Sequence, residues 1–161
     1  MVRLVPMTEE EFEAFMKISM QDQARGQVQA GTWRAEDADN NIEMLRSQFL
    51  PDGLTTPDHF FYSIEAAGAD ARVGGLWYMV EEEEGKRQVF VVDIQIYDPY
   101  RRRGYGSQAF QAMEEKAREM GITTLSLHVF THNHPARAMY EKLGYVGTET
   151  MMSKEIGAHV G

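Results

Sequence analysis

The sequence predicts a mixed α/β fold of the α+β kind, in which a mostly antiparallel sheet carries helices on both faces. Three strand-like runs follow one another through short turns between residues 59 and 96, and such turns join antiparallel strands. A helical segment then separates the last of these runs from another at residues 125–130, and this spacing is typical of a parallel crossover. The expected order of elements is β-α-α-β-β-β-α-β-α-β, with the fourth and fifth strands parallel.

The amino-terminal third of the chain predicts one strand and two helices. A short strand is expected over residues 3–6. Thr8 and Glu11 have the spacing of a capping box, which predicts a helix that reaches the region of Arg25 and Gly26 and is broken by Gly31 and Thr32. A second amphipathic helix follows and stops at Pro51. Nothing in these two helices selects a particular functional residue.

The middle of the chain predicts three consecutive strands. Residues 59–65 alternate between apolar and polar side chains. Residues 73–80 are nearly all apolar, as expected of a central strand covered on both faces. The four glutamates at 81–84 are typical of a solvated hairpin turn, and they lead into the apolar strand 89–96.

The last part of the chain predicts two helices and two strands. The third helix should open at Ser107 and end at Gly121, where a glycine is favoured. A strand is expected over residues 125–130, and Asn133 should cap a fourth helix. A final strand is expected over residues 145–154.

Composition excludes several classes of protein. The chain has 16 basic and 25 acidic residues, a net charge of −9, which argues against a general nucleic-acid binder. It has no cysteine, so disulfides and thiolate metal sites are excluded. No apolar run is long enough to span a membrane, and the first residues do not resemble a signal peptide. We expect a cytoplasmic protein with one domain over residues 1–161.

A basic glycine turn follows the strand 89–96 and reads Arg101-Arg102-Arg103-Gly104-Tyr105-Gly106. Closely spaced glycines let backbone N–H groups converge, and the helix that follows adds unpaired donors, so the turn predicts a diphosphate site. A nucleotide P-loop would need a lysine after the last glycine, and none is present. On the turn alone, a solvated basic loop is an equal alternative.

A second motif makes the pattern specific. Residues 133–145 have asparagine, alanine, tyrosine, glycine and tyrosine at the spacing Asn-x-x-Ala-x-x-x-Tyr-x-x-x-Gly-Tyr. Together with Arg-x-x-Gly-x-Gly, this resembles the GNAT superfamily of N-acetyltransferases along the whole chain. The resemblance implies acetyl-CoA as the acyl donor, no metal, and a pantetheine arm between splayed fourth and fifth strands. It implies cofactor contacts from Ile94, Ile96, Arg101, Arg102, Arg103, Gly104, Tyr105, Gly106, Ser107 and Asn133.

The resemblance also suggests catalytic residues. Tyr140 matches the tyrosine that protonates the leaving thiolate, and its alternative is a core tyrosine packed on Tyr145. Asp93 is the only charge in an apolar strand and is a candidate general base. Its alternatives are a structural aspartate, or a base elsewhere reached through water. The family often has a glutamate where this chain has Val92, and a proline where it has Asp98.

The expected reaction is acetyl transfer to a primary amine, on a small molecule or a peptide. The acidic balance favours a cationic amine, although acidity for solubility alone is an alternative. A catalytically idle CoA-binding or sensor module is the main competing function. A homodimer is left open, and the sequence does not identify the amine.

Overall fold

The computed structural model describes residues 1–68 and 71–157 and contains a five-stranded sheet in the order β1-β2-β3-β4-β5. The strands are β1 (Val2–Pro6), β2 (His59–Ala66), β3 (Ala71–Glu83), β4 (Lys86–Ile96) and β5 (Leu125–Leu127). Neighbouring strands are antiparallel except β4 and β5, which are parallel. The predicted sheet type and the parallel pair are therefore confirmed.

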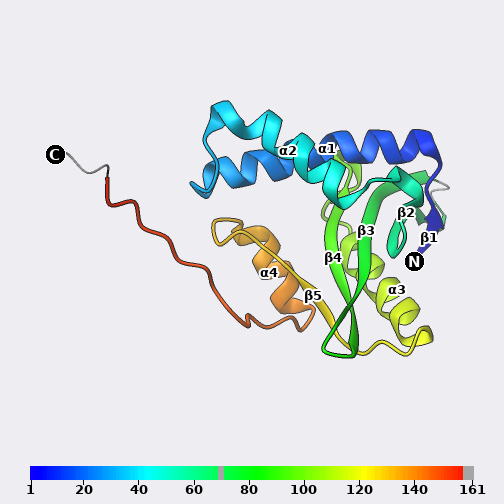
Figure 1. Cartoon of the computed structure of the whole chain (residues 1–161). Helices are drawn as coiled ribbons and strands as arrows, with labels where there is room; N and C mark the ends of the chain where they lie inside the picture. The colour runs from blue at the N-terminus through cyan, green and yellow to red at the C-terminus, as the bar shows by residue number, and fades with distance from the viewer. Residues whose placement is uncertain (69–70, 158–161) are drawn as a thin grey trace.

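Four α-helices surround this sheet (Figure 1): α1 (Glu9–Gln29), α2 (Ala38–Phe49), α3 (Tyr105–Glu119) and α4 (His134–Lys142). Short 3-10 turns lie at Ala35–Asp37, Gly53–Thr55 and Asp98–Tyr100. The predicted capping box starts α1, because Thr8 N donates to Glu11 Oε1 at 3.0 Å and Glu11 N donates to Thr8 Oγ1 at 3.1 Å. Satisfying these end groups fixes where the first helix begins.

The sheet has a hydrophobic core on each face. On one face, α1 packs Phe12, Phe15 and Met16 against Phe61 and Trp77. On the other face, α3 supplies most of the buried helical residues, and α4 adds partly buried ones. The apolar strand β3 contributes to both cores, since Trp77 lies in the first and Leu76 and Tyr78 lie in the second. Helices on both faces are confirmed, and so is the doubly covered central strand.

Strand β4 contains an irregularity that opens the sheet. Trp77 pairs with Asp93 and Tyr78 with Val91, so Val92 is an extra residue in β4. A bulge of this kind bends a strand and increases its twist. The β4–β5 ladder accordingly stops at the Val91–Leu127 pair. Beyond this pair, no described strand pairs with the edge of β4 that faces β5, as expected if the two strands splay apart.

The predicted final strand over residues 145–154 is wrong. The chain has no regular secondary structure from residue 145 to 157, and it runs away from the body beyond α4 (Figure 1). Val146, Met151, Met152 and Ile156 are exposed by 80–89%. Alternating apolar residues favour a strand only where a neighbouring strand accepts the backbone hydrogen bonds, and no described strand pairs with this segment.

Two predicted boundaries also shift. Strand β5 ends at Leu127 instead of residue 130, because the chain turns there so that Phe130 packs on Gly26 of α1. A Cβ at Gly26 would collide with this ring, so the close approach requires glycine. Helix α3 begins at Tyr105 instead of Ser107, which places Tyr105, Gly106 and Ser107 in its first turn.

Candidate active site

The basic turn is fixed to the end of β4 by one arginine. Arg101 Nε donates to Ile96 O at 2.9 Å, and Arg101 Nη1 pairs with Asp98 Oδ1 at 2.9 Å. The backbone then passes through positive φ at Arg102 (63°) and Gly104 (82°). Left-handed residues in such a turn direct nearby N–H groups to one side and form an anion-binding concavity. Gly104 adopts this conformation without strain, and the Arg101 side chain supports the turn.

The start of α3 leaves several backbone donors without helical partners. Gly104 is the N-cap and provides no side-chain cap. The first capping-turn bond is that of Gln108 N to Gly104 O at 3.1 Å, so the N–H groups before it are available. Among the described residues, no carboxylate lies within ion-pair distance of Arg102 or Arg103. This combination of donors and exposed positive charge suits a diphosphate.

Three elements converge on Gly106. A Cβ at this position would lie 3.4 Å from Met139 Sδ on α4 and 3.9 Å from Ile96 Cγ1 on β4. The end of β4, the start of α3 and helix α4 therefore meet beside the open edge of β4. Asn133 begins α4, and its Oδ1 accepts from Ala136 N at 3.3 Å, as the capping pattern predicts. An extended ligand arm beside Ile94 and Ile96 would have the turn at one end.

Tyr140 lies on α4 and packs edge-on against two aromatic rings. Its ring centroid is 5.6 Å from that of Phe110 and 6.0 Å from that of Tyr145. Burial, followed by the charge of Asp93, raises the pKa of Tyr140 to about 12. The phenol is therefore protonated at neutral pH. In the described part of the chain, no hydrogen bond engages the Tyr140 hydroxyl. The ring therefore contributes to packing, and the hydroxyl is available to donate a proton.

Asp93 is half-buried and held by an amide instead of an arginine. Gln95 Nε2 donates to Asp93 Oδ2 at 2.9 Å and to Phe15 O of α1 at 3.2 Å. Burial raises the pKa of Asp93, while hydrogen bonds from Gln95 and Ser19 and the backbone at Ile94 oppose the rise. A carboxylate with a raised pKa is a stronger base than an ordinary aspartate, and no described cationic side chain pairs with Asp93.

Asp93 and Tyr140 influence each other electrostatically, because the Asp93 charge contributes to the raised pKa of Tyr140. The two groups come from β4 and α4, and Asp93 lies two residues beyond Val91, the last β4 residue that pairs with β5. The structure thus brings the candidate acid, the candidate base and the basic turn to one region. A protonated phenol can donate a proton and an ionised carboxylate can accept one, so the two groups together could serve as general acid and general base.

Sequence reasoning missed two polar residues of this region, Ser19 and Gln95. Both are buried, at 5% and 9% exposed. Ser19 interrupts the apolar stripe of α1, and Gln95 stands between two isoleucines in β4. A polar residue within an apolar pattern could have identified both, because a buried polar side chain needs a hydrogen-bond partner and therefore indicates a polar site in the core. In each case the partner became visible only when α1 packed on the sheet.

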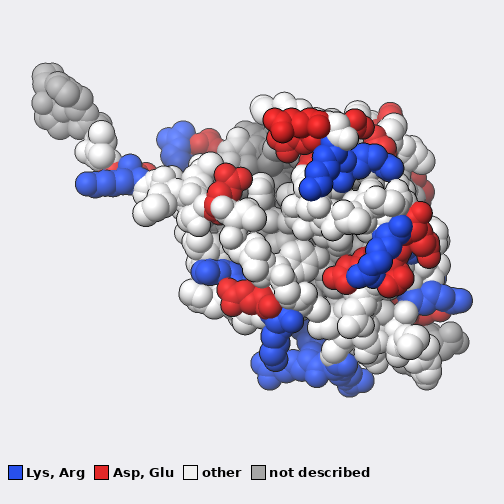
Figure 2. Space-filling model, turned by 90° about the horizontal axis from the view of Figure 1, so that it is seen from below, with Lys and Arg blue, Asp and Glu red and all other residues white. Residues whose placement is uncertain are grey.

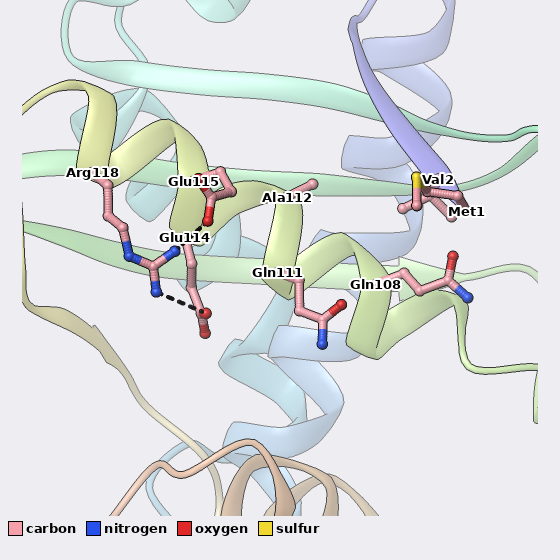
Figure 3. Close-up of a pocket in the computed structure, with 8 residues that line it drawn as sticks. All are labelled: Met1, Val2, Gln108, Gln111, Ala112, Glu114, Glu115 and Arg118. Atoms are coloured by element: carbon pink, nitrogen blue, oxygen red, sulfur yellow. Dashed lines mark hydrogen bonds and ion pairs between the residues drawn. The ribbon is translucent and has the colours of Figure 1, made fainter.

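A separate groove of about 690 Å³ lies between α3 and the start of β1 (Figure 3). Its lining is mostly α3 side chains together with Met1 and Val2. Arg118 pairs there with Glu115 at 2.6 Å and Glu114 at 3.8 Å, which compensates its charge. Neither Asp93 nor Tyr140 reaches this groove, so we do not take it as the active site.

The surface charge and the possible metal ligands of the described residues bear on what the chain can bind. Figure 2 shows basic side chains clustered at one margin of the molecule and acidic ones dispersed over the same face. Over residues 1–68 and 71–157, no group of three His, Asp or Glu side chains is placed to hold a metal ion. No described helix is long and apolar enough to cross a membrane.

A mixed sheet that opens beside a glycine turn and a helix start defines an acetyltransferase of the GNAT fold. The chain belongs to the GNAT family, because the family model for acetyltransferases matches residues 13–145. It is 41% identical over 155 residues to the uncharacterized N-acetyltransferase YycN of Bacillus subtilis, covering 96% of this chain and 99% of that protein. It is 35% identical over 153 residues to the uncharacterized N-acetyltransferase YdgE of the same organism, covering 95% and 97%.

Solved structures agree with the family assignment. The crystal structure of the acetyltransferase YycN from Bacillus subtilis superposes with a TM-score of 0.90 at 40% identity, covering 98% of this chain and all of that one. A GCN5-related N-acetyltransferase from Ralstonia eutropha gives a TM-score of 0.67 at 20% identity, covering 98% of this chain and 100% of that one. The second likeness concerns the fold alone.

Proposed function

We propose that this protein transfers an acetyl group from acetyl-CoA to a primary amine, as a single catalytic domain. The observation that carries the proposal is the convergence of Asp93, Tyr140 and the basic turn around the open edge of β4. Family membership supports acyl transfer, and the two Bacillus subtilis relatives bear N-acetyltransferase names.

The turn fits the anionic part of the acyl donor. The N–H groups from Arg102 to Ser107 and the exposed Arg102 and Arg103 side chains would hold a diphosphate. Backbone groups near Ile94 and Ile96, on the edge of β4 beyond its last pair with β5, would bind the pantetheine arm as a strand would, and Asn133 would contact the same arm. A backbone N–H of β4 would polarise the acetyl carbonyl. When bound, acetyl-CoA supplies an acetyl group already activated as a thioester.

Asp93 and Tyr140 would handle the protons. The Asp93 carboxylate takes a proton from the substrate ammonium, directly or through water, which frees the nitrogen lone pair. As the nitrogen–carbon bond forms and the carbon–sulfur bond breaks, Tyr140 gives its phenolic proton to the departing thiolate. The second amine proton and the proton held by Asp93 pass to solvent, and Tyr140 is reprotonated from there, so each turnover of an ammonium substrate releases one proton.

The raised pKa of Tyr140 is compatible with this role. Moving a proton from a phenol of pKa about 12 to a thiolate of pKa near 8.5 is uphill by about 5 kcal/mol. A turnover of about 10 per second corresponds to a barrier of about 16 kcal/mol, which is far larger. The free-energy cost of the proton transfer is therefore smaller than an ordinary enzymatic barrier.

A cationic amine remains the favoured substrate, although part of the acidic charge is compensated. Glu11 pairs with Arg72 at 3.1 Å, and Asp37 pairs with Arg34 at 2.9 Å. Glu9, Glu10 and Asp39, in or near the first two helices, have no basic partner within 4 Å among the described residues. These carboxylates support attraction of a polyamine or a basic amino compound, whereas Asp22, whose charge also acts on Asp93, is paired with Arg25 at 3.2 Å.

The test is thiol release from acetyl-CoA against a panel of amines, with product mass measured. The proposal expects acetylated product with at least one primary amine, and more with diamines than with neutral monoamines. The competing function is an idle CoA-binding module, which Val92 favours because the family's glutamate is absent there. Tight CoA binding with no turnover on any amine or amino-terminal peptide would establish that alternative.

A further inference from the structure

Gln95 is a buried glutamine whose amide nitrogen is hydrogen-bonded and whose amide oxygen is not. Its side chain lies two residues beyond Asp93 in β4, and therefore on the same face of the sheet, which is covered by α1. Nε2 donates to Asp93 Oδ2 at 2.9 Å and to Phe15 O at 3.2 Å, whereas no donor among the described residues reaches Oε1. Because a backbone carbonyl cannot donate, Phe15 O fixes the amide with Nε2 facing it.

Stability alone does not explain a glutamine at this position. A buried carbonyl oxygen without a donor is unfavourable for folding, and an apolar side chain of similar size would avoid that cost. The neighbours Ile94 and Ile96 are apolar and pack against the core on the other face of the sheet. A polar residue that is kept in an apolar strand against its effect on folding indicates a role at a functional site.

The contact between Gln95 and α1 depends on a close approach of the helix to the sheet. Gly75 of β3 lies opposite Gln95 in the β3–β4 register. A Cβ at Gly75 would lie 2.5 Å from Phe15 Cδ2, so the absence of a side chain there lets this turn of α1 come near the sheet. Ser19, one turn later in α1, hydrogen-bonds Asp93. One turn of α1 therefore supplies an acceptor for the Gln95 amide and a partner for the Asp93 carboxylate.

We propose that Gln95 is the positioning residue of the base, which holds the Asp93 carboxylate in its ionised form and ties its orientation to the packing of α1 on the sheet. This inference rests on the proposed function, in which Asp93 takes a proton from the substrate ammonium. An N–H donor stabilises a carboxylate, and the Gln95 amide in this way opposes the burial that raises the pKa of Asp93. Without the amide, Asp93 would keep its own proton to higher pH and could not accept one from the amine.

The other titratable groups near Asp93 do not replace the amide. From α1, the charge of Asp22 raises the pKa of Asp93, and Asp22 is itself paired with Arg25 at 3.2 Å. From α4, Tyr140 is protonated at neutral pH, because its own pKa is raised to about 12, and so it carries no charge there. No described cationic side chain pairs with Asp93. Hydrogen bonds, and that of Gln95 first among them, therefore favour the ionised form.

The first experiment does not depend on turnover. Melting temperatures of the wild type, Gln95→Met, Asp93→Asn and the double variant are measured from about pH 4 to about pH 9. Methionine has nearly the length of glutamine but no donor, so the folded pKa of Asp93 should rise further. Ionisation of Asp93 then costs more stability, and the melting temperature of Gln95→Met should fall relative to that of the wild type as pH rises. In the Asp93→Asn background, the effect of Gln95→Met should not change with pH.

Two further variants accompany this comparison. Gln95→Leu also lacks the donor and should show the same trend as Gln95→Met. Gln111→Met is the matched control, because Gln111 is an exposed glutamine on α3, and its effect should be independent of pH. An effect of Gln95→Met and Gln95→Leu that stays constant with pH when Asp93 is present would overturn the proposal.

The second experiment measures the specificity constant across pH for one amine that the wild type acetylates, so that the titration of the amine itself is common to all variants. Near neutral pH, Gln95→Met should lower it about tenfold or more, and the rising limb of the profile should move to higher pH, with partial recovery in alkaline solution. A loss by the same factor at every pH would contradict the proposal. If the wild type acetylates no amine, the proposed function is wrong, and the melting temperatures alone decide whether Gln95 controls the ionisation of Asp93.

Discussion

Removal of the Tyr140 hydroxyl should separate catalysis from stability. In Tyr140→Phe the ring contacts with Phe110 and Tyr145 remain, at 5.6 and 6.0 Å between centroids, and no hydrogen bond is lost. We expect the free energy of unfolding to change by less than about 0.5 kcal/mol. Turnover should fall about 10- to 1000-fold, which is about 1.4–4 kcal/mol in transition-state free energy. Steady-state acetyl-CoA turnover and thermal unfolding measure the two quantities.

Tyr145 provides a matched control for this experiment. Its hydroxyl is buried without a hydrogen-bond partner, which is unfavourable for folding. Tyr145→Phe should therefore leave turnover unchanged and stabilise the protein by up to about 1–3 kcal/mol. If Tyr140→Phe turns over as fast as the wild type at saturating substrate, or if both variants lose activity equally, Tyr140 is not the acid.

Three further predictions concern the turn, the base and the substrate. Gly106→Asp should abolish the thermal stabilisation that CoA gives the wild type, because the aspartate side chain would place negative charge in the space beside Met139 and Ile96. Equal stabilisation of the variant and the wild type by CoA would show that the turn does not bind the cofactor. Asp93→Asn should lower turnover about 100-fold or more. The pKa of Asp93 is raised in the folded protein, so its ionisation lowers the stability of the wild type as pH rises through that pKa. The melting temperature of Asp93→Asn should therefore increase relative to that of the wild type between about pH 4 and about pH 7. If the difference between the two melting temperatures is the same at every pH, Asp93 does not titrate as described. The preference for a diamine over a neutral monoamine should shrink between low and high salt. A ratio of the two specificity constants that is independent of salt would exclude steering by the carboxylates of the first two helices.

Much of the fold follows from local patterns. The capping box at Thr8, the apolar run of β3 and the glycine turn each determine their element through interactions within a few residues. The bulge at Val92 could not be predicted in the same way, because it depends on the register between β3 and β4. The strand predicted over residues 145–154 did not form for a related reason, since strand formation requires a partner that local sequence does not specify.

The candidate site also combines features that local motifs predict with features that depend on long-range contacts. The motifs identified Tyr140, Asn133 and the turn by their spacing. The environment of Asp93 depends on Ser19 and on the amide of Gln95, which reaches Phe15 O, a residue 80 positions away in the chain. Such long-range contacts arise only when α1 packs on the sheet. The pKa of Asp93, and hence its suitability as a base, was therefore beyond sequence patterns alone.

The most direct test of the acyl-donor site is hydrogen exchange with and without CoA. The account predicts that CoA slows exchange of the backbone amides in the basic turn, residues 102–107, and along the open edge of β4 near residues 94–96. The groove between α3 and β1 (Figure 3) should show no protection. Protection in that groove with none in the turn would contradict the assignment of the active site.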